Sequence, residues 1–260
     1  MKASSLLGLS VLALAWCPPE VRADTPRPRV LLSGVIVHGY FPGTPAPDAA
    51  VRLVNTDPDR PASLTGFSLS DEFTPRKQRK GKDPRFEDED LLVDEPDPDK
   101  PQRGRPRGNR VLRFPDGATI PPGGELWVAA SAKEFRQVFG EAPAFEAIDS
   151  DPGVPDMRPA QGFLWLNEGY GTVALVDPRG VTVDYVAWQG PKQDAFKEGA
   201  FDDVPWVGGP VALKEDTPYG WKGRVLGRAR DEAGRVLPDT DRARDWPVGF
   251  SRMALGVMPT

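Results

Sequence analysis

Two neighbouring runs of charged residues offer the clearest candidate for binding chemistry in this sequence. The first run is basic and contains Arg76, Lys77, Arg79, Lys80 and Lys82. A basic run of this length is typical of segments that bind nucleic acid, heparin or anionic lipid. The second run, residues 87–99, is dominated by acids and could neutralise the first. The alternative is therefore a solvated loop of mixed charge, and the five basic residues are our candidate partner-binding site.

Patterns that indicate catalysis or metal binding are scarce. The chain has one histidine, His38, and one cysteine, Cys17. Zinc sites use several His or Cys ligands, a Ser-His-Asp triad would depend on His38 alone, and a phospholipase D site needs two H-x-K motifs. The acids of residues 87–99 lack the spacing of a calcium-binding EF-hand. We therefore predict a protein that is not an enzyme, with no catalytic residue, no cofactor and no metal site.

The first 23 residues resemble a secretory signal. A short basic start at Lys2 precedes an apolar stretch over residues 6–16, and Val21-Arg22-Ala23 fits the small-residue cleavage rule. The alternative is a lipoprotein anchored at Cys17, but a lipobox needs a small residue where Trp16 stands. We expect cleavage after Ala23 and a secreted or periplasmic protein. Its partner would be a protein or a cell-envelope polymer, with nucleic acid reached only through the basic run.

Composition and periodicity favour an all-β fold. The 30 prolines and 27 glycines together exceed average usage and indicate many turns. Short alternating or β-branched runs predict strands over residues 30–38, 50–55, 64–70, 126–130, 163–166, 171–176 and 181–188. One helix is predicted over residues 132–139, with Ser131 as its N-cap and Gly140 as its C-terminal stop. Residues 177–180 predict a type I turn closed by Gly180, followed by a strand with Val181, Val183 and Tyr185 on one face.

Two regions depart from this pattern. Residues 72–110 are rich in charge and poor in apolar side chains, so we expect a disordered insertion. Residues 191–260 form a C-terminal extension, in which residues 222–238 could make a hairpin around Ala233-Gly234. The expected organisation is a signal peptide (1–23), a linker (24–29), one domain (30–190) and this extension.

The order of motifs between Val30 and Trp188 resembles the lamin tail domain. The motifs are V-R-L-V-N, L-T-G-F-S-L-S, F-P-D-G-A-T-I-P-P-G-G-E-L-W-V and G-T-V-A-L-V-D-P-R-G. The resemblance implies an immunoglobulin-like β-sandwich and no common catalytic residues. The motif residues would be structural: Gly66, Phe67, Pro122, Gly123, Gly124, Leu126, Val128, Val173, Leu175 and Gly180.

Function follows from the resemblance only in general terms. We expect an exported, non-enzymatic binding module, because sandwich loops present variable surfaces on a rigid scaffold. The C-terminal extension is similar to segments that join lamin tail domains to phospholipase D-like domains. This leaves the alternative of an accessory or truncated partner in a phosphodiesterase or nuclease system.

Overall fold

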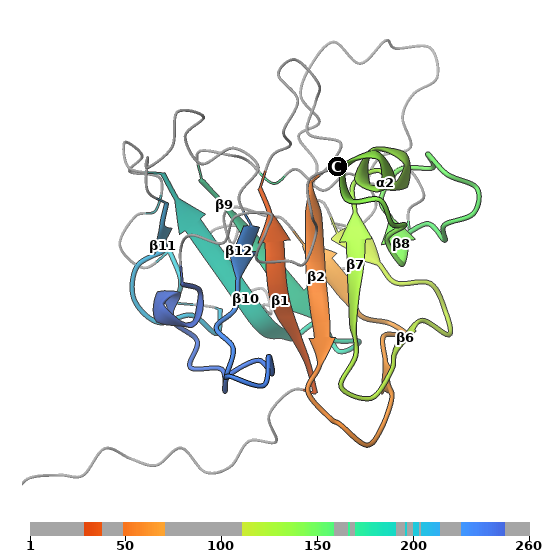
Figure 1. Cartoon of the computed structure of the whole chain (residues 1–260). Helices are drawn as coiled ribbons and strands as arrows, with labels where there is room; N and C mark the ends of the chain where they lie inside the picture. The colour runs from red at the N-terminus through yellow and green to blue at the C-terminus, as the bar shows by residue number, and fades with distance from the viewer. Residues whose placement is uncertain are drawn as a thin grey trace, which may run out of the picture.

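Two five-stranded sheets pack face to face in the computed structural model (Figure 1). The structure describes residues 29–37, 49–70, 111–158, 166, 170–190, 196, 200–202, 204–213 and 225–247. The first sheet has the strand order β12-β1-β2-β7-β8, and the second has the order β11-β10-β9-β4-β5. A two-stranded ribbon pairs β3 with β6. The prediction of an all-β sandwich is confirmed.

The strands are short, as the density of turn residues predicts. The first sheet consists of β1 (Val30–Ile36), β2 (Ala50–Asn55), β7 (Glu125–Ala129), β8 (Phe145–Glu146) and β12 (Val225–Gly227). The second consists of β4 (Ser68–Ser70), β5 (Val111–Arg113), β9 (Tyr170–Val176), β10 (Thr182–Gln189) and β11 (Val211–Ala212). The ribbon pairs β3 (Ala62–Ser63) with β6 (Thr119–Ile120). Only the pairs β7–β8 and β10–β11 are parallel among the described strand pairs.

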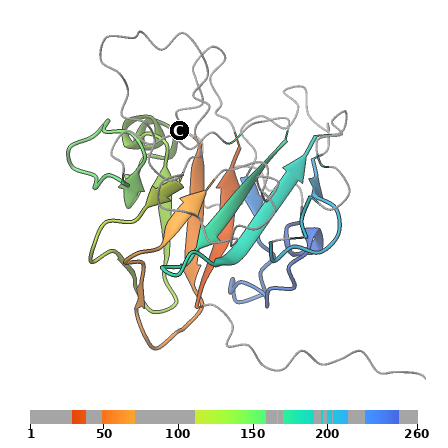
Figure 2. The same ribbon diagram turned by 180° about the vertical axis from the view of Figure 1, so that it is seen from behind.

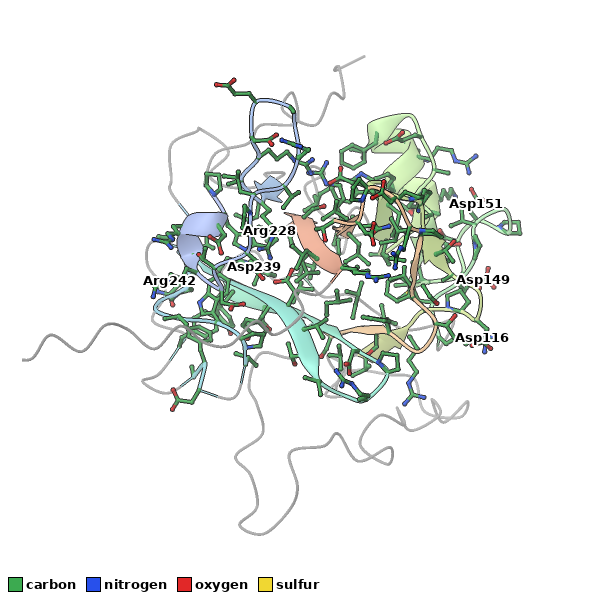
Figure 3. The ribbon with its side chains drawn as sticks, turned by 90° about the horizontal axis from the view of Figure 1, so that it is seen from below. Asp116, Asp149, Asp151, Arg228, Asp239 and Arg242 are labelled. Atoms are coloured by element: carbon green, nitrogen blue, oxygen red, sulfur yellow. The ribbon has the colours of Figure 1, made fainter. Side chains whose placement is uncertain are left out.

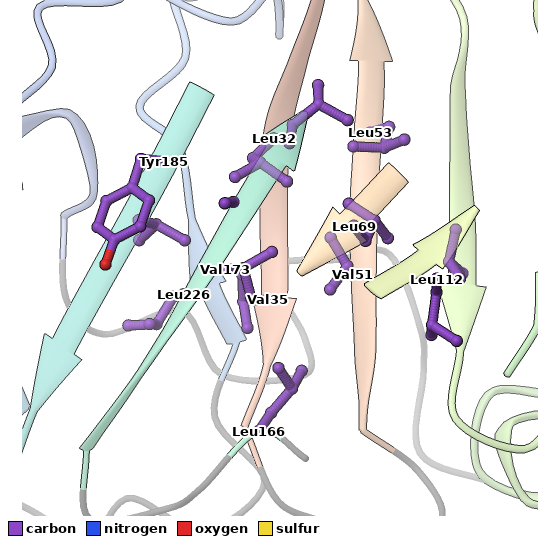
Figure 4. Packing of buried hydrophobic residues seen from close by; sticks show 14 of the residues in the cluster. Leu32, Val35, Val51, Leu53, Leu69, Leu112, Leu166, Val173, Tyr185 and Leu226 are labelled. Carbon is purple, nitrogen blue, oxygen red and sulfur yellow. The ribbon is translucent and has the colours of Figure 1, made fainter. Parts of the chain in front are cut away.

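The core lies between the two sheets. Alternate residues of each strand point inward, so Leu32, Val51 and Leu53 of the first sheet face Leu69 and Val173 of the second (Figure 4). Each of these five side chains has a relative exposure of 0%. Burial of apolar area on this scale is the main stabilising contribution to a sandwich that contains no disulfide.

The helix α2 (Ala132–Phe139), the only α-helix in the described part of the chain, covers part of the outer face of the first sheet. Its N-cap is Ser131, whose hydroxyl accepts a hydrogen bond from the Glu134 amide, and Gly140 ends it in the left-handed conformation at φ 76°. Phe135 and Phe139 pack on apolar side chains of β1, β2 and β7. Both caps and both ends of the predicted helix are confirmed.

The Pro-Pro-Gly-Gly turn between β6 and β7 is held from the side by Asn55. This residue has a relative exposure of 0%, and its side-chain amide donates to the carbonyl oxygens of Arg60 (2.7 Å), Ile120 (3.3 Å) and Pro121 (3.0 Å). The turn itself closes through the Gly124 amide, which donates to the Pro121 carbonyl at 3.0 Å. The motif is therefore a structural corner, as the sequence predicts.

Residues 154–158 join the two sheets along one side of the sandwich. The Met157 amide donates to the Glu146 carbonyl of β8 at 2.7 Å. Arg158 and Arg113 of β5 then exchange two backbone hydrogen bonds, each 2.8 Å long. Both β8 and β5 are outer strands of their sheets, so this short segment covers an edge of each.

The C-terminal extension contributes a strand to each sheet. β11 pairs with β10, and β12 pairs with β1. The sequence left open whether this extension folds alone or packs on the sandwich. Its described residues pack on the sandwich and form one outer strand of each sheet.

Three local predictions need correction. The strand expected over residues 64–70 is broken, because the Phe67 amide turns back to the Leu64 carbonyl and Gly66 takes a φ of 79°. A register shift at the start of β10 leaves Val181 50% exposed, so it does not share the buried face of Tyr185. The hairpin around Gly234 exists, yet its first arm pairs with β1 and only a bridge at Arg230–Val236 links the two arms. Of the strand expected over residues 163–166, only residue 166 lies in the described part.

Candidate functional site

The charged insertion begins and ends at one point on the sandwich. Ser70, the last residue of β4, pairs with Val111, the first residue of β5, in an antiparallel register. Residues 71–110 connect these two partners and lie outside the described residues, as do Arg76, Lys77, Arg79, Lys80 and Lys82. The edge hairpin that carries the insertion is ordered by pairing of β4 with β9 on its other side.

Several connections leave the sandwich at the same end, which we call the loop end. In the first sheet, Ile36, Ala50 and Ala129 lie side by side in register at this end. Ile36 precedes and Ala50 follows the connection 38–48, and Ala129 shortly precedes the helix α2. In the second sheet, β4 (light orange in Figure 2) runs towards the same end, which is at the top in Figures 1 and 2, and its antiparallel partner β5 begins there. The insertion is therefore attached at the loop end, through the paired ends of β4 and β5.

An acidic cluster lies beside the first turn of α2. Carboxylate oxygens of Glu146, Asp149 and Asp156 are all within 4.8 Å of one another. Oxygen donors of this kind suit hard cations such as Ca²⁺. One oxygen of Asp156, Oδ1, is buried without a hydrogen-bond partner. Burial raises the pKa of Asp156, and the neighbouring charges of Asp149 and Glu146 raise it further.

Glu146 has a structural role in this cluster. It is wholly buried, and its Oε2 accepts a hydrogen bond from the Ala132 amide at the first turn of α2, 2.8 Å away. Its Oε1 accepts from the amides of Ser150 (3.1 Å) and Asp151 (2.9 Å), and the Ser150 hydroxyl also donates to Oε2. A carboxylate in this position complements the helix N-terminus and fixes the following turn. Its oxygens are thus already used in ordering α2 and residues 149–151.

A second polar group lies inside the sandwich and centres on Arg228. Its Nη2 contacts both carboxylate oxygens of Asp184 at 2.7 Å, and both side chains are 1% exposed. Its Nη1 donates to Asp239 Oδ1 at 2.6 Å, and its Nε donates to the Leu32 carbonyl at 2.8 Å. The Trp246 ring lies 4.9 Å from the guanidinium carbon. This group joins both sheets to the C-terminal extension.

The charges of this group shift one another's protonation. Burial raises the pKa of Asp184 to about 7, although the attraction of Arg228 acts in the opposite direction. Burial alone would lower the pKa of Arg228, but Asp184 and Asp239 together raise it. Figure 3 shows Arg228 and Asp239 on the side of the molecule opposite to Asp149 and Asp151, so the two polar groups are separate.

The residues predicted to be structural lie where the sequence places them, but two polar groups were not predicted. The structural residues take their expected places: Leu126, Val128, Val173 and Leu175 are in the core, and Gly123 and Gly180 have positive φ. The acidic cluster and the Arg228 group were missed. The available signal for the acidic cluster was the spacing Asp149-x-Asp151-x-Gly153, but only Asp149 of these residues belongs to the cluster. Asp151 instead pairs with Arg136 at 2.8 Å. For Arg228 no local motif exists, because its partner Asp184 is 44 residues away.

Comparisons with known proteins do not assign a family. No family model matches the chain, and no curated protein matches it. Among solved structures, it is similar to a DUF4876 family protein from Bacteroides thetaiotaomicron, with a TM-score of 0.45 and 14% sequence identity. That match covers 89% of this chain and 74% of the other. No helix among the described residues is long and apolar enough to cross a membrane.

Proposed function

We propose that this protein is an exported, non-enzymatic binding module of the lamin-tail type, which recognises a partner through its charged insertion. The observation that carries the proposal is the pairing of Ser70 with Val111. A long segment of unlike composition is attached there through two adjacent backbone positions of an ordered hairpin. Variable segments on rigid scaffolds commonly carry recognition.

The charge of the insertion indicates the kind of partner. Five basic residues within positions 76–82 favour a polyanionic surface, such as an anionic cell-envelope polymer. The expected leader over residues 1–23 would bring the mature chain to that surface. The acidic run of residues 87–99 would limit non-specific attraction, because the fields of neighbouring opposite charges partly cancel.

The test is a deletion of residues 76–107 in the mature chain. We expect the thermal midpoint to stay within about 2 °C, because the β4–β5 pairing remains and the deleted sequence is rich in charge and poor in apolar side chains. Binding to purified cell-wall sacculi, measured by co-sedimentation, should be lost. The matched variant replaces Arg76, Lys77, Arg79, Lys80 and Lys82 by Gln and keeps the chain length. A large fall in the midpoint of the deletion variant, or sacculus binding that both variants retain, would refute the proposal.

A further inference from the structure

The C-terminal strand β12 pairs with the edge of a sheet in the way that a bound extended peptide would. It lies on the outer edge of β1, with Val225, Leu226 and Gly227 opposite Ile36, Val35 and Gly34. The ladder continues to the Arg228 amide, which donates to the Ser33 carbonyl at 3.1 Å. Such backbone pairing at a sheet edge is the geometry of peptide recognition by strand addition, in which main-chain bonds supply affinity.

Two side chains of this strand and its next residue enter the sandwich. Leu226 is 2% exposed and belongs to the hydrophobic core, and Arg228, two positions later, is 1% exposed. Alternate residues of an extended segment point to the same face. A segment paired with the edge of β1 therefore inserts one apolar side chain and one arginine into the sandwich. The intervening Gly227 contributes no side chain to this selection.

The receptor for the arginine belongs to the body of the sandwich. Asp184 is on β10 of the opposite sheet, and its carboxylate accepts hydrogen bonds from the amides of Leu32 and Tyr185, each at 2.7 Å. The Leu32 carbonyl accepts a further bond from Arg228 Nε. These groups are held by β1 and β10 and match a guanidinium, which donates in a planar fork. A buried carboxylate of this kind needs a cation as partner.

The same C-terminal segment also covers the arginine from outside. Asp239 bonds Arg228 Nη1, and the ring of Trp246 lies over the guanidinium. Asp245 orders this cover, because it accepts from the Thr240 amide (2.8 Å) and hydroxyl (2.6 Å). Residues 225–247 therefore contain the inserted side chains and their cover within one short stretch of chain.

We propose that the outer edge of β1 together with Asp184 forms a peptide-recognition site, which this chain's own residues 225–230 occupy in cis. Its ligands are extended peptides with a large apolar residue followed two positions later by arginine. This site does not involve the insertion and does not rest on the function proposed above. A competing peptide would have to replace Leu226 and Arg228 together.

The experiment uses the full mature chain with a specific protease site placed within residues 214–221 and then cleaved. A fluorescently labelled peptide of residues 222–247 is added, and its incorporation is followed by anisotropy and native mass spectrometry. We expect exchange of the protein's own segment for the labelled peptide. A peptide with Arg228→Gln should bind about 30-fold more weakly or worse, since one partner of a buried charge pair is lost. A peptide with Arg230→Gln should bind within about fivefold, since that ion pair is at the surface.

Two protein variants complete the test. In the Asp184→Asn protein, the preference for arginine over glutamine at position 228 should largely disappear. In the uncleaved Arg228→Gln chain, the natural peptide should bind, whereas the uncleaved natural chain should not take it up. Unfolding upon cleavage, a folded cleaved protein that exchanges nothing, or equal binding of the Arg228→Gln and natural peptides would each overturn the proposal.

Discussion

The indole ring of Trp188 lies directly against the backbone of Gly171 in the neighbouring strand. The two residues are register partners of β10 and β9, and a Cβ placed on Gly171 would be 2.3 Å from Trp188 Cζ2. Trp188 itself is 0% exposed. The ring can occupy this part of the core only because residue 171 has no side chain.

Replacing Gly171 by Ala should therefore destabilise the sandwich by about 1–3 kcal/mol, since an overpacked core must displace a rigid ring. Urea denaturation followed by tryptophan fluorescence measures the change. Gly209→Ala is the matched control, because nothing lies within 4 Å of a Cβ built there. Equal midpoints for the two variants would contradict this explanation.

Asn55→Ala should cost about 1–3 kcal/mol, because the carbonyl groups of Arg60, Ile120 and Pro121 lose their donor. Thr56→Ala serves as control; its hydroxyl makes one exposed bond to the Arg29 carbonyl and should matter by less than about 0.5 kcal/mol. Chemical denaturation of both variants tests the difference. If Asn55→Ala behaves like Thr56→Ala, the amide does not hold the turn.

Arg228 and Arg230 should differ sharply although they lie two residues apart. Arg228→Met leaves Asp184 buried without its cation, which should cost about 3–5 kcal/mol. Arg230→Met removes a surface pair with Glu125 and should cost under about 1 kcal/mol. Thermal unfolding of the two variants measures the two losses of stability. Similar losses would show that the buried ion pair contributes no more than the surface pair.

The stability of the protein should depend on pH through Asp184. Its pKa rises from the ordinary value of 3.8 to about 7 in the folded protein, mainly through burial. Folding therefore favours the protonated acid, and this contribution is present below about pH 4 and is lost as the pH rises through 7. From pH 4 to pH 7, the free energy of unfolding should fall more steeply for the natural chain than for Asp184→Asn. Parallel curves would exclude this proton linkage.

Asp156→Asn should stabilise the protein at neutral pH. Burial and the charges of Asp149 and Glu146 raise the pKa of Asp156, so its ionised form is disfavoured in the folded state. At pH 3 the carboxyl is protonated and the substitution should have little effect. Thermal unfolding at the two pH values, with a chelator present, gives the comparison. A neutral-pH gain no larger than the gain at pH 3 would argue against charge repulsion as the cause.

The sequence predicted those features that depend on near neighbours in the chain. The helix α2 has its cap residues beside it, and β2 places Val51 and Leu53 in the core on either side of Arg52, as a strand period of two requires. The Pro-Pro-Gly-Gly turn was recognisable for the same reason. The hydrogen bonds from Asn55 that stabilise this turn were not predicted. The role of Asn55 depends on the approach of residues 120 and 121, more than 60 positions away.

Features that depend on distant contacts escaped prediction. Arg228 looks like any charged residue of a basic stretch, and only the closed sandwich brings Asp184 against it. Val181 fits the alternation of its strand, yet the shift of register between Thr182 and Asp184 turns it to solvent. The acidic cluster likewise forms only when residues 154–158 cross from one sheet to the other.

The pairing of Ser70 with Val111 has a consequence for how this chain can be lengthened. The strand ends are neighbours in the folded state, so a connection of any length need only return to its starting point. The entropic cost of closing such a connection grows with the logarithm of its length, by about 0.6 kcal/mol for each doubling. The position between β4 and β5 can therefore accept a foreign sequence with little loss of stability, which makes it a natural place for grafting.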